Sequence, residues 1–225
     1  MAPMAVGKLC FLEEAGKLKR LDRRGWIIKG IDKPETISGH MYRMSLMPLL
    51  ILDKFGDMDK DKIIKLCLIH DLAECIVGDI TPHDNVSKED KHERETSAIN
   101  YLASLLPNTQ SAELKELFDE YEDQKTPEAQ LTKDFDIFDM VHQAFEYEKL
   151  EFVRTGIIPD LSEFFCQNKV LSRIKNEEVN DLVSEIVNQR DKFWKENNSN
   201  NLPNQLKEKD NSTQIEGDQV VNIQV

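Results

Sequence analysis

Cysteine is scarce in this sequence, and long apolar runs are missing from it. The four cysteines form no CxxC pair, so their spacing favours neither a zinc–cysteine site nor a disulfide framework, and a reducing compartment fits better. The longest apolar stretch, residues 44–52, is far too short to span a bilayer. The N-terminus lacks a charged head followed by a long apolar segment, so we expect no secretory signal. These absences predict a cytoplasmic protein without membrane contact, with nuclear presence as an open alternative.

Positive charge is also in short supply. The net charge of −13 disfavours binding to a nucleic-acid polymer, which depends on clustered lysine and arginine. The basic residues that exist are unevenly distributed, because residues 1–30 carry seven lysines and arginines against three acids. A basic patch on an acidic protein suits a small anionic ligand. A solvated helix end is the alternative interpretation.

Strand patterns are nearly absent as well. Apolar residues recur with the 3.6-residue period of helices and without strict alternation, which predicts an all-α domain over residues 1–196. From residue 197 to 225 the chain is polar, rich in asparagine and low in complexity, and we predict a disordered tail there. Helices are expected over residues 9–21, 40–51 (capped by Thr36 or Ser38), 62–77, 87–106, 112–122, 129–155, 160–166 and 176–196.

One predicted helix carries ionisable side chains among apolar residues. His70 and Asp71 are consecutive, and Glu74 follows four residues after the histidine, so helical spacing would bring the three together. A buried aspartate beside a buried histidine is costly unless a charge pairs with them. A divalent cation would supply that charge. A core histidine hydrogen-bonded to an acid is the alternative.

Two further residues share this context. His40 lies in an apolar helix of its own, and Asp136 stands between bulky apolar residues in a third helix. Three helices could therefore bring His40, His70, Asp71 and Asp136 to one cation. Mixed nitrogen and oxygen ligands suit Mn, Co, Fe or Zn. The other histidines, which lack an acidic neighbour in a buried pattern, are His83, His92 and His142. We therefore predict one metal ion rather than a two-metal clamp.

The order H…HD…D resembles the HD superfamily of metal-dependent phosphohydrolases. The longer segments 38–44, 70–82, 84–95 and 135–148 resemble the HD-domain 5′-deoxynucleotidases, and the likeness extends over residues 10–195. This resemblance implies an HD-domain helical bundle. It also implies a site with one divalent metal ion (Mn, Co, Mg, Fe or Zn) bound by His40, His70, Asp71 and Asp136.

The resemblance assigns roles to residues beside the metal. Glu74 matches the acid that positions or deprotonates the attacking water, and Asp79 matches an acid near the sugar that could favour deoxyribose. An arginine and a tryptophan upstream of the first ligand would hold phosphate and nucleoside. The run Arg23-Arg24-Gly25-Trp26 supplies them, and we favour Arg23 over Arg24 for the phosphate. Glu74 and Asp79 could instead be solvated acids, and Trp26 a core residue.

The resemblance thus predicts hydrolysis of deoxyribonucleoside 5′-monophosphates to deoxyribonucleosides and phosphate. The metal would polarise the phosphoryl group, and an arginine fork matches phosphate oxygens. Because related enzymes are dimers, we also expect a homodimer. Three alternatives are an HD phosphohydrolase for triphosphates, cyclic nucleotides or alarmones, a non-catalytic metal-stabilised binding module, and an interaction protein that acts through its tail.

Overall fold

The computed structural model describes residues 4–51 and 58–198. The predicted tail therefore lies, from residue 199 on, outside the described residues. The chain divides into two compact units, Met1–Ile186 and Val187–Val225, and every site discussed below belongs to the first. The domain boundary at residue 196 remains a prediction from composition.

The described residues form helices and turns, with no strand among them, as the sequence predicted. One isolated antiparallel bridge joins Asp22 to Thr36. Within residues 4–51 and 58–198 no helix has the length and apolar character needed to cross a membrane. The elements follow in the order α1 (Met4–Ala15), η1 (Gly16–Lys19), α2 (Arg24–Ile28), α3 (Ile37–Ile51), α4 (Lys60–Ile69), α5 (Glu74–Val77), η3 (Pro82–Asp84), α6 (Lys88–Ser104), α7 (Asn108–Asp123), α8 (Pro127–Thr155), η4 (Ser162–Phe165), η5 (Leu171–Arg173) and α9 (Glu177–Asn198).

The prediction of one continuous helix over residues 62–77 is wrong. Helix α4 ends at Ile69, a turn follows over residues 70–73, and the short α5 begins at Glu74. Tight hydrogen bonds three residues apart replace the helical pattern there, with Leu72 N donating to Ile69 O at 2.9 Å and Glu74 N to Asp71 O at 3.1 Å. His70 and Asp71 thus stand at a helix end, and Glu74 reaches them through a turn.

Two other predicted helices also need correction, and one short helix was not predicted at all. The predicted helix over residues 9–21 begins earlier, as α1, and passes into the 3-10 turn η1. Helix α2, just before the first expected metal ligand, was not predicted, because five residues are too few to show a period. The segment 160–166 contains no α-helix, only the 3-10 helix η4 at Ser162–Phe165.

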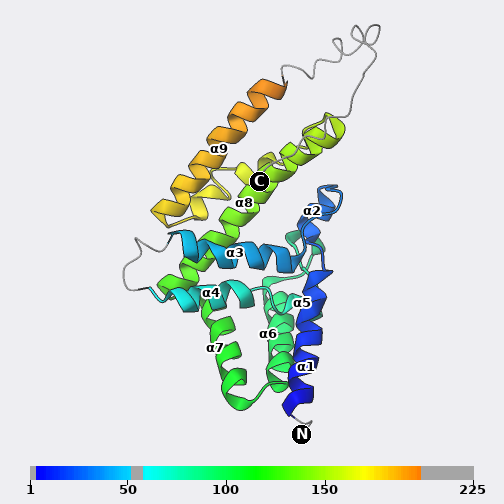
Figure 1. Cartoon of the computed structure of the whole chain (residues 1–225), viewed down its shortest axis with the longest axis vertical. Coiled ribbons are helices and arrows are strands. Elements are labelled where there is room, and N and C mark those ends of the chain that lie inside the picture. Colours follow the sequence, from blue (N-terminus) through cyan, green and yellow to red (C-terminus); the bar gives the residue numbers. More distant parts are fainter. Residues whose placement is uncertain (1–3, 52–57, 199–225) are drawn as a thin grey trace, which may run out of the picture. The chain divides into compact units, whose positions relative to one another are not determined.

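Helices α3, α4 and α8 pack against one another and form the frame of the site. Figure 1 shows α3 and α4 side by side, with α8 running across them. Of the two capping residues considered for α3, the structure selects Thr36, whose Oγ1 accepts the Gly39 N–H at 3.2 Å. Each of the three helices contributes fully buried apolar side chains, namely Ile37 and Met44, Ile63 and Leu66, and Phe135 and Val141.

Candidate active site

The four expected metal ligands converge at the meeting point of α3, α4 and α8. Ligand atoms of His40, His70 and Asp71 all lie within 4.8 Å of one another. The His40 Nε2 atom is 3.4 Å from Asp136 Oδ1 and 3.7 Å from Asp71 Oδ2, and the His70 Nε2 atom is 3.1 Å from Asp71 Oδ2. Two imidazoles and two carboxylates, from helices α3 and α8 and the turn after α4, therefore face one point.

The proton position on His70 is fixed by a backbone carbonyl. Its Nδ1 atom lies 3.0 Å from the Cys67 carbonyl oxygen. Because that oxygen can only accept, Nδ1 carries the proton and Nε2 of the neutral ring offers a lone pair. The Nε2 atoms of His40 and His70 are both buried and make no hydrogen bond within the described residues. Buried polar atoms without partners are costly, and a divalent cation would satisfy both.

The other nitrogen of His40 is held by a carboxylate that sequence reasoning missed. The Nδ1 atom of His40 lies 2.7 Å from Oδ2 of the fully buried Asp139. Arg43 donates its Nε–H to the second oxygen of this carboxylate. Arg43 also donates to Glu146 at 2.6 Å and to Gln143 at 2.8 Å. A carboxylate on the far nitrogen is the usual way in which a metal-binding imidazole is oriented.

Charge at the site favours a bound cation. Burial and Arg23 lower the pKa of His40, but the nearby carboxylates of Asp136 and Asp139 outweigh them and raise that pKa to about 9. Without a cation, His40 thus holds a proton between carboxylates, and a metal ion would balance the same charge. The residues present fit a divalent cation bound by nitrogen and oxygen donors.

Asp136 is oriented by two neighbours of its own. Its Oδ2 atom accepts from Lys133 Nζ at 2.7 Å and from Tyr121 OH at 3.4 Å. Burial raises the pKa of Asp136, but Lys133 and the two histidines hold it well below its usual value. The carboxylate is therefore ionised, and its Oδ1 atom remains for the side that faces His40.

Glu74 is buried at the start of α5, with 4% of the residue exposed. Its Oε2 atom makes no hydrogen bond within the described residues. Burial and the nearby carboxylates of Asp71 and Asp79 raise the pKa of Glu74 well above its usual value. Burial of this kind brings a carboxylate closer to the working range of a general base. The general-base role remains a prediction.

The two consecutive arginines point to different places. Arg23 has a buried Nη1 atom without a hydrogen-bond acceptor in the described part of the chain, and its Nε atom is 4.0 Å from Glu35 Oε1. Burial opposes the charge of Arg23, yet Asp136 and Asp71 raise its pKa further above the usual value, so it stays a cation. Arg24 is about half exposed and pairs with Asp84 at 2.6 Å. This geometry favours Arg23 as the phosphate contact.

Backbone hydrogen bonds connect the arginine to the first metal-ligand helix. Arg23 N donates to Glu35 O at 3.0 Å, and Ile37 N donates to Leu21 O at 2.8 Å. Residues 21–23 therefore run antiparallel to residues 35–37, directly before α3. Arg23 is therefore connected by its backbone to the segment from which the His40 helix, α3, begins.

A cavity of about 280 Å³ opens beside Arg23 and contains Trp26 and Asp79 in its lining. Trp26 is only 2% exposed, and its ring packs against Tyr147 and Phe164 with centroid distances of 5.2 and 4.7 Å. The ring therefore forms part of the cavity floor and leaves no open face for stacking. The remaining lining residues are Gly25, Lys29, Ile80, Thr81, Pro82, His83, Met140, Glu163 and Phe164.

Trp26 also orients an acid that the sequence did not single out. The indole Nε1–H donates to Glu35 Oε1 at 3.1 Å, and the Glu35 backbone N–H donates to the Tyr147 hydroxyl at 2.7 Å. The same Glu35 carboxylate lies near the Arg23 guanidinium. Trp26 thus influences the site through Glu35 as well as through the cavity floor.

A second basic residue near the site carboxylates, Lys91, was also not identified from the sequence. Burial lowers the pKa of Lys91, but Glu95 and the site carboxylates of Glu74 and Asp71 raise it by more. Lys91 lies on α6 and forms an ion pair with Glu95 at 3.5 Å. A spacing of four residues in a helix looks like an ordinary surface pair, and nothing in the sequence distinguishes it.

The weaker histidine candidates stay apart from the metal ligands. His92 is exposed and lies 3.1 Å from Glu122, and His142 is 3.8 Å from Glu146. His83 lines the cavity beside Trp26.

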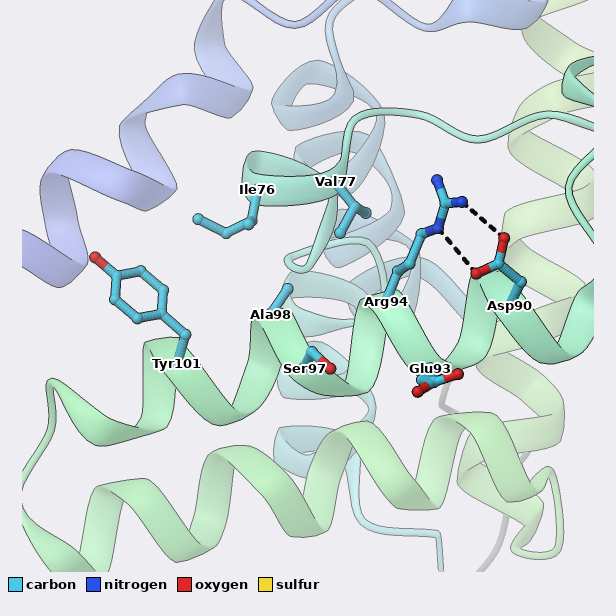
Figure 2. A pocket seen from close by; sticks show the side chains of 8 residues that line it. All are labelled: Ile76, Val77, Asp90, Glu93, Arg94, Ser97, Ala98 and Tyr101. Carbon is cyan, nitrogen blue, oxygen red and sulfur yellow. Dashed lines mark hydrogen bonds and ion pairs between the residues drawn. The ribbon is translucent and has the colours of Figure 1, made fainter.

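A larger cavity, of about 500 Å³, lies away from these residues against α5 and α6. Figure 2 shows Ile76 and Tyr101 at one end and, at the other, Arg94, which donates two hydrogen bonds to Asp90 at 3.1 and 2.7 Å. None of the predicted site residues lines it. Because Arg94 is already paired with Asp90, it is less available to bind a phosphate. We therefore assign the expected chemistry to the 280 Å³ cavity beside Arg23.

Helices that bring two histidines and two aspartates to one point, beside a buried glutamate and an arginine, define a metal-site protein suited to phosphate chemistry. The chain belongs to the HD-domain family, whose model matches residues 15–193. The resemblance seen in the sequence motifs is thereby confirmed, together with the all-α fold.

Curated relatives and solved structures agree with this assignment. The chain is 43% identical to 5′-deoxynucleotidase HDDC2 of Xenopus laevis, covering 84% of this chain and 90% of that protein. It is 38% identical to 5′-deoxynucleotidase YGK1 of Saccharomyces cerevisiae, with coverages of 83% and 85%. It also resembles a structure described as a "predicted metal-dependent phosphohydrolase" from Magnetospirillum magnetotacticum, with TM-score 0.66, 25% identity and coverages of 85% and 97%.

Proposed function

We propose that this protein is a metal-dependent 5′-deoxynucleotidase, which hydrolyses deoxyribonucleoside 5′-monophosphates to deoxyribonucleosides and inorganic phosphate. The observation that carries the proposal is the convergence of His40, His70, Asp71 and Asp136 beside Glu74. The curated relatives, which are 38–48% identical to this chain, bear the same activity in their names.

Each residue has a separate task in the proposed reaction. Arg23 binds the phosphate through its guanidinium, whose Nη1 atom has no hydrogen-bond partner among the described residues and whose planar shape matches phosphate oxygens in a fork. Glu74 takes a proton from the attacking water, whose oxygen forms the new bond to phosphorus while the bond to the sugar oxygen breaks, and this proton then passes to the departing sugar oxygen. A divalent cation bound by His40, His70, Asp71 and Asp136 would supply Lewis-acid polarisation of the phosphoryl group. Asp79 lines the cavity where the sugar would lie.

A substrate profile tests this proposal. We expect the full chain, loaded with Co²⁺ or Mn²⁺, to release phosphate faster from deoxyribonucleoside monophosphates than from ribonucleoside monophosphates, triphosphates or cyclic dinucleotides. Faster hydrolysis of triphosphates would overturn the choice of substrate. Metal binding without hydrolysis of any nucleotide would favour the binding module.

The same assay examines the domain division and the choice of metal. We propose residues 1–196 as the catalytic domain, so a chain ending at Glu196 should keep its turnover; loss of activity would assign the tail a catalytic part. We further propose a single metal ion, and titration should saturate at one equivalent.

We also propose a cytoplasmic location. The four free cysteines support it, because free thiols fit a reducing compartment, and imaging of the tagged protein tests it.

We propose a homodimer formed through an apolar stripe on α3. Tyr42, Leu46, Leu49 and Leu50 lie on this helix with 64%, 38%, 56% and 80% of each residue exposed. Exposed apolar side chains gathered at helical spacing are typical of association surfaces, and a self-complementary patch gives a two-fold dimer.

A charge within the stripe should therefore dissociate the dimer. Leu49→Glu is expected to shift the protein from dimer to monomer in sedimentation equilibrium, because a carboxylate would be buried without a partner. Leu12→Glu, at a position 63% exposed on α1, is the matched control and should leave the dimer intact. A wild-type monomer at micromolar concentration would contradict the proposal.

A further inference from the structure

A short segment forms a wall between two cavities. Asp79 and Ile80 line the 280 Å³ cavity beside Arg23 and also a second cavity of about 410 Å³. Both residues follow α5, in the connection that leads to η3. We call residues 78–85 the wall segment. With open space on both sides of Asp79 and Ile80, packing alone does not determine where the segment lies.

The wall segment is internally well formed. It begins at Gly78 with a φ of +78° and ends at Asn85 with a φ of +54°, so a left-handed residue turns the chain at each end. Within it, Asp84 Oδ2 accepts the Thr81 N–H and hydroxyl, each at 2.8 Å. These bonds give the segment its shape but do not connect it to the rest of the protein.

Arg24 supplies that connection at two points. Its Nη2 atom lies 2.6 Å from Asp84 Oδ1, and its backbone N–H donates to Asp79 Oδ2 at 2.7 Å. The Arg24 side chain also lines the 410 Å³ cavity. One residue at the start of α2 therefore holds both ends of the wall, directly next to the arginine that faces the site carboxylates.

We propose that Arg24 is a positioning residue that anchors the wall segment to α2 and so holds Asp79 against the sugar of the substrate. This proposal rests on the proposed nucleotidase function. Arg23 and Arg24 then have different roles: Arg23 binds the phosphate, and Arg24 determines how well Asp79 is placed to recognise the sugar. Selectivity for deoxyribose over ribose should depend on Arg24, although its side chain touches no substrate.

The test compares substrates with and without a sugar. Arg24→Ala removes the side-chain tie and keeps the backbone N–H bond to Asp79. Asp84→Asn removes the charge that pairs with Arg24 and also changes the acceptor of the Thr81 donors. An exposed ion pair contributes at most about 1 kcal/mol, or about fivefold, so we expect KM for deoxyadenosine monophosphate to rise by up to about fivefold. The preference over adenosine monophosphate should fall by a similar factor. Hydrolysis of p-nitrophenyl phosphate, which has no sugar, should be unchanged.

Two further variants separate positioning from general damage. Arg24→Lys keeps the charge and should restore part of the selectivity. Arg94→Ala removes another arginine that lines the 410 Å³ cavity but pairs with Asp90 on its own helix, and it should behave as wild type. Because Asp84→Asn already weakens the contact with Arg24, the double variant should be little worse than Asp84→Asn alone.

Failure of the Arg24–Asp84 anchor and failure of the proposed nucleotidase function give different results. Unchanged selectivity in Arg24→Ala, or an equal loss with p-nitrophenyl phosphate, would overturn the proposal. If the metal-loaded wild type hydrolyses no deoxynucleotide, the proposed function has failed, and hydrogen exchange of residues 78–85 decides the anchoring. Faster exchange in Arg24→Ala than in Arg94→Ala supports the tie, and equal exchange refutes it.

Discussion

Replacing Glu74 with glutamine is expected to lower kcat by about 10²–10⁴-fold while leaving the metal bound, which is the range for loss of a general base. Glutamine has nearly the same shape as glutamate and fits the same buried position, but it cannot take a proton from water. The metal ligands are other residues, so their donor atoms are unchanged. Single-turnover kinetics and metal analysis of the same preparation measure the two effects separately.

Asp134→Asn is the matched control for this variant. Asp134 is a buried carboxylate on α8, and it accepts the backbone N–H groups of Lys175 and Asn176 at 3.0 and 2.8 Å. Its loss should lower the melting temperature without lowering kcat. If Glu74→Gln turned over substrate at the wild-type rate, Glu74 would be a structural acid and the assigned mechanism would fall.

Replacing Asp139 with asparagine is expected to weaken metal binding by about 10–100-fold, the range measured for groups that orient a metal-binding histidine. Asp139 receives the His40 Nδ1–H on one oxygen and the Arg43 guanidinium on the other. Asparagine keeps a single acceptor oxygen, so one of these donors must face an NH₂ group. The His40 ring then loses either its orientation or its partner.

Calorimetric titration with Co²⁺ or Zn²⁺ measures this effect. Glu146→Gln serves as the control, because Glu146 also pairs with Arg43, at 2.6 Å, but does not contact His40. The control should bind metal as wild type does. A folded Asp139→Asn protein with unchanged metal affinity would show that His40 is oriented by packing alone.

The sequence was sufficient to predict that four side chains, the expected metal ligands, meet at the centre of the fold. His40, His70, Asp71 and Asp136 were recognisable because each is a charged or polar residue in an apolar context, where burial without a partner is costly. The all-α class followed from periodicity. Neither inference needed to know how the helices cross.

The turn at residues 70–73 could not be predicted, because the apolar pattern continues through it from Leu66 to Val77. Asp139 and Arg43 were missed for another reason. They are 96 residues apart in the sequence, and each alone looks like a solvated charge. The different directions of Arg23 and Arg24 likewise depend on Asp79 and Asp84, which are distant in sequence and close only in the folded chain.

The break after α4 has a consequence for His70 itself. In an unbroken helix the Cys67 carbonyl would be directed at the backbone amide four residues later, that of Asp71. Here the helix stops, and this oxygen accepts the His70 Nδ1 proton instead. The end of α4 therefore lacks one main-chain hydrogen bond. The contact that replaces it favours the His70 tautomer with its proton on Nδ1, which leaves Nε2 able to bind a cation. Substitutions that extend α4 through residue 73 would therefore make the protein more helical and a poorer metal binder.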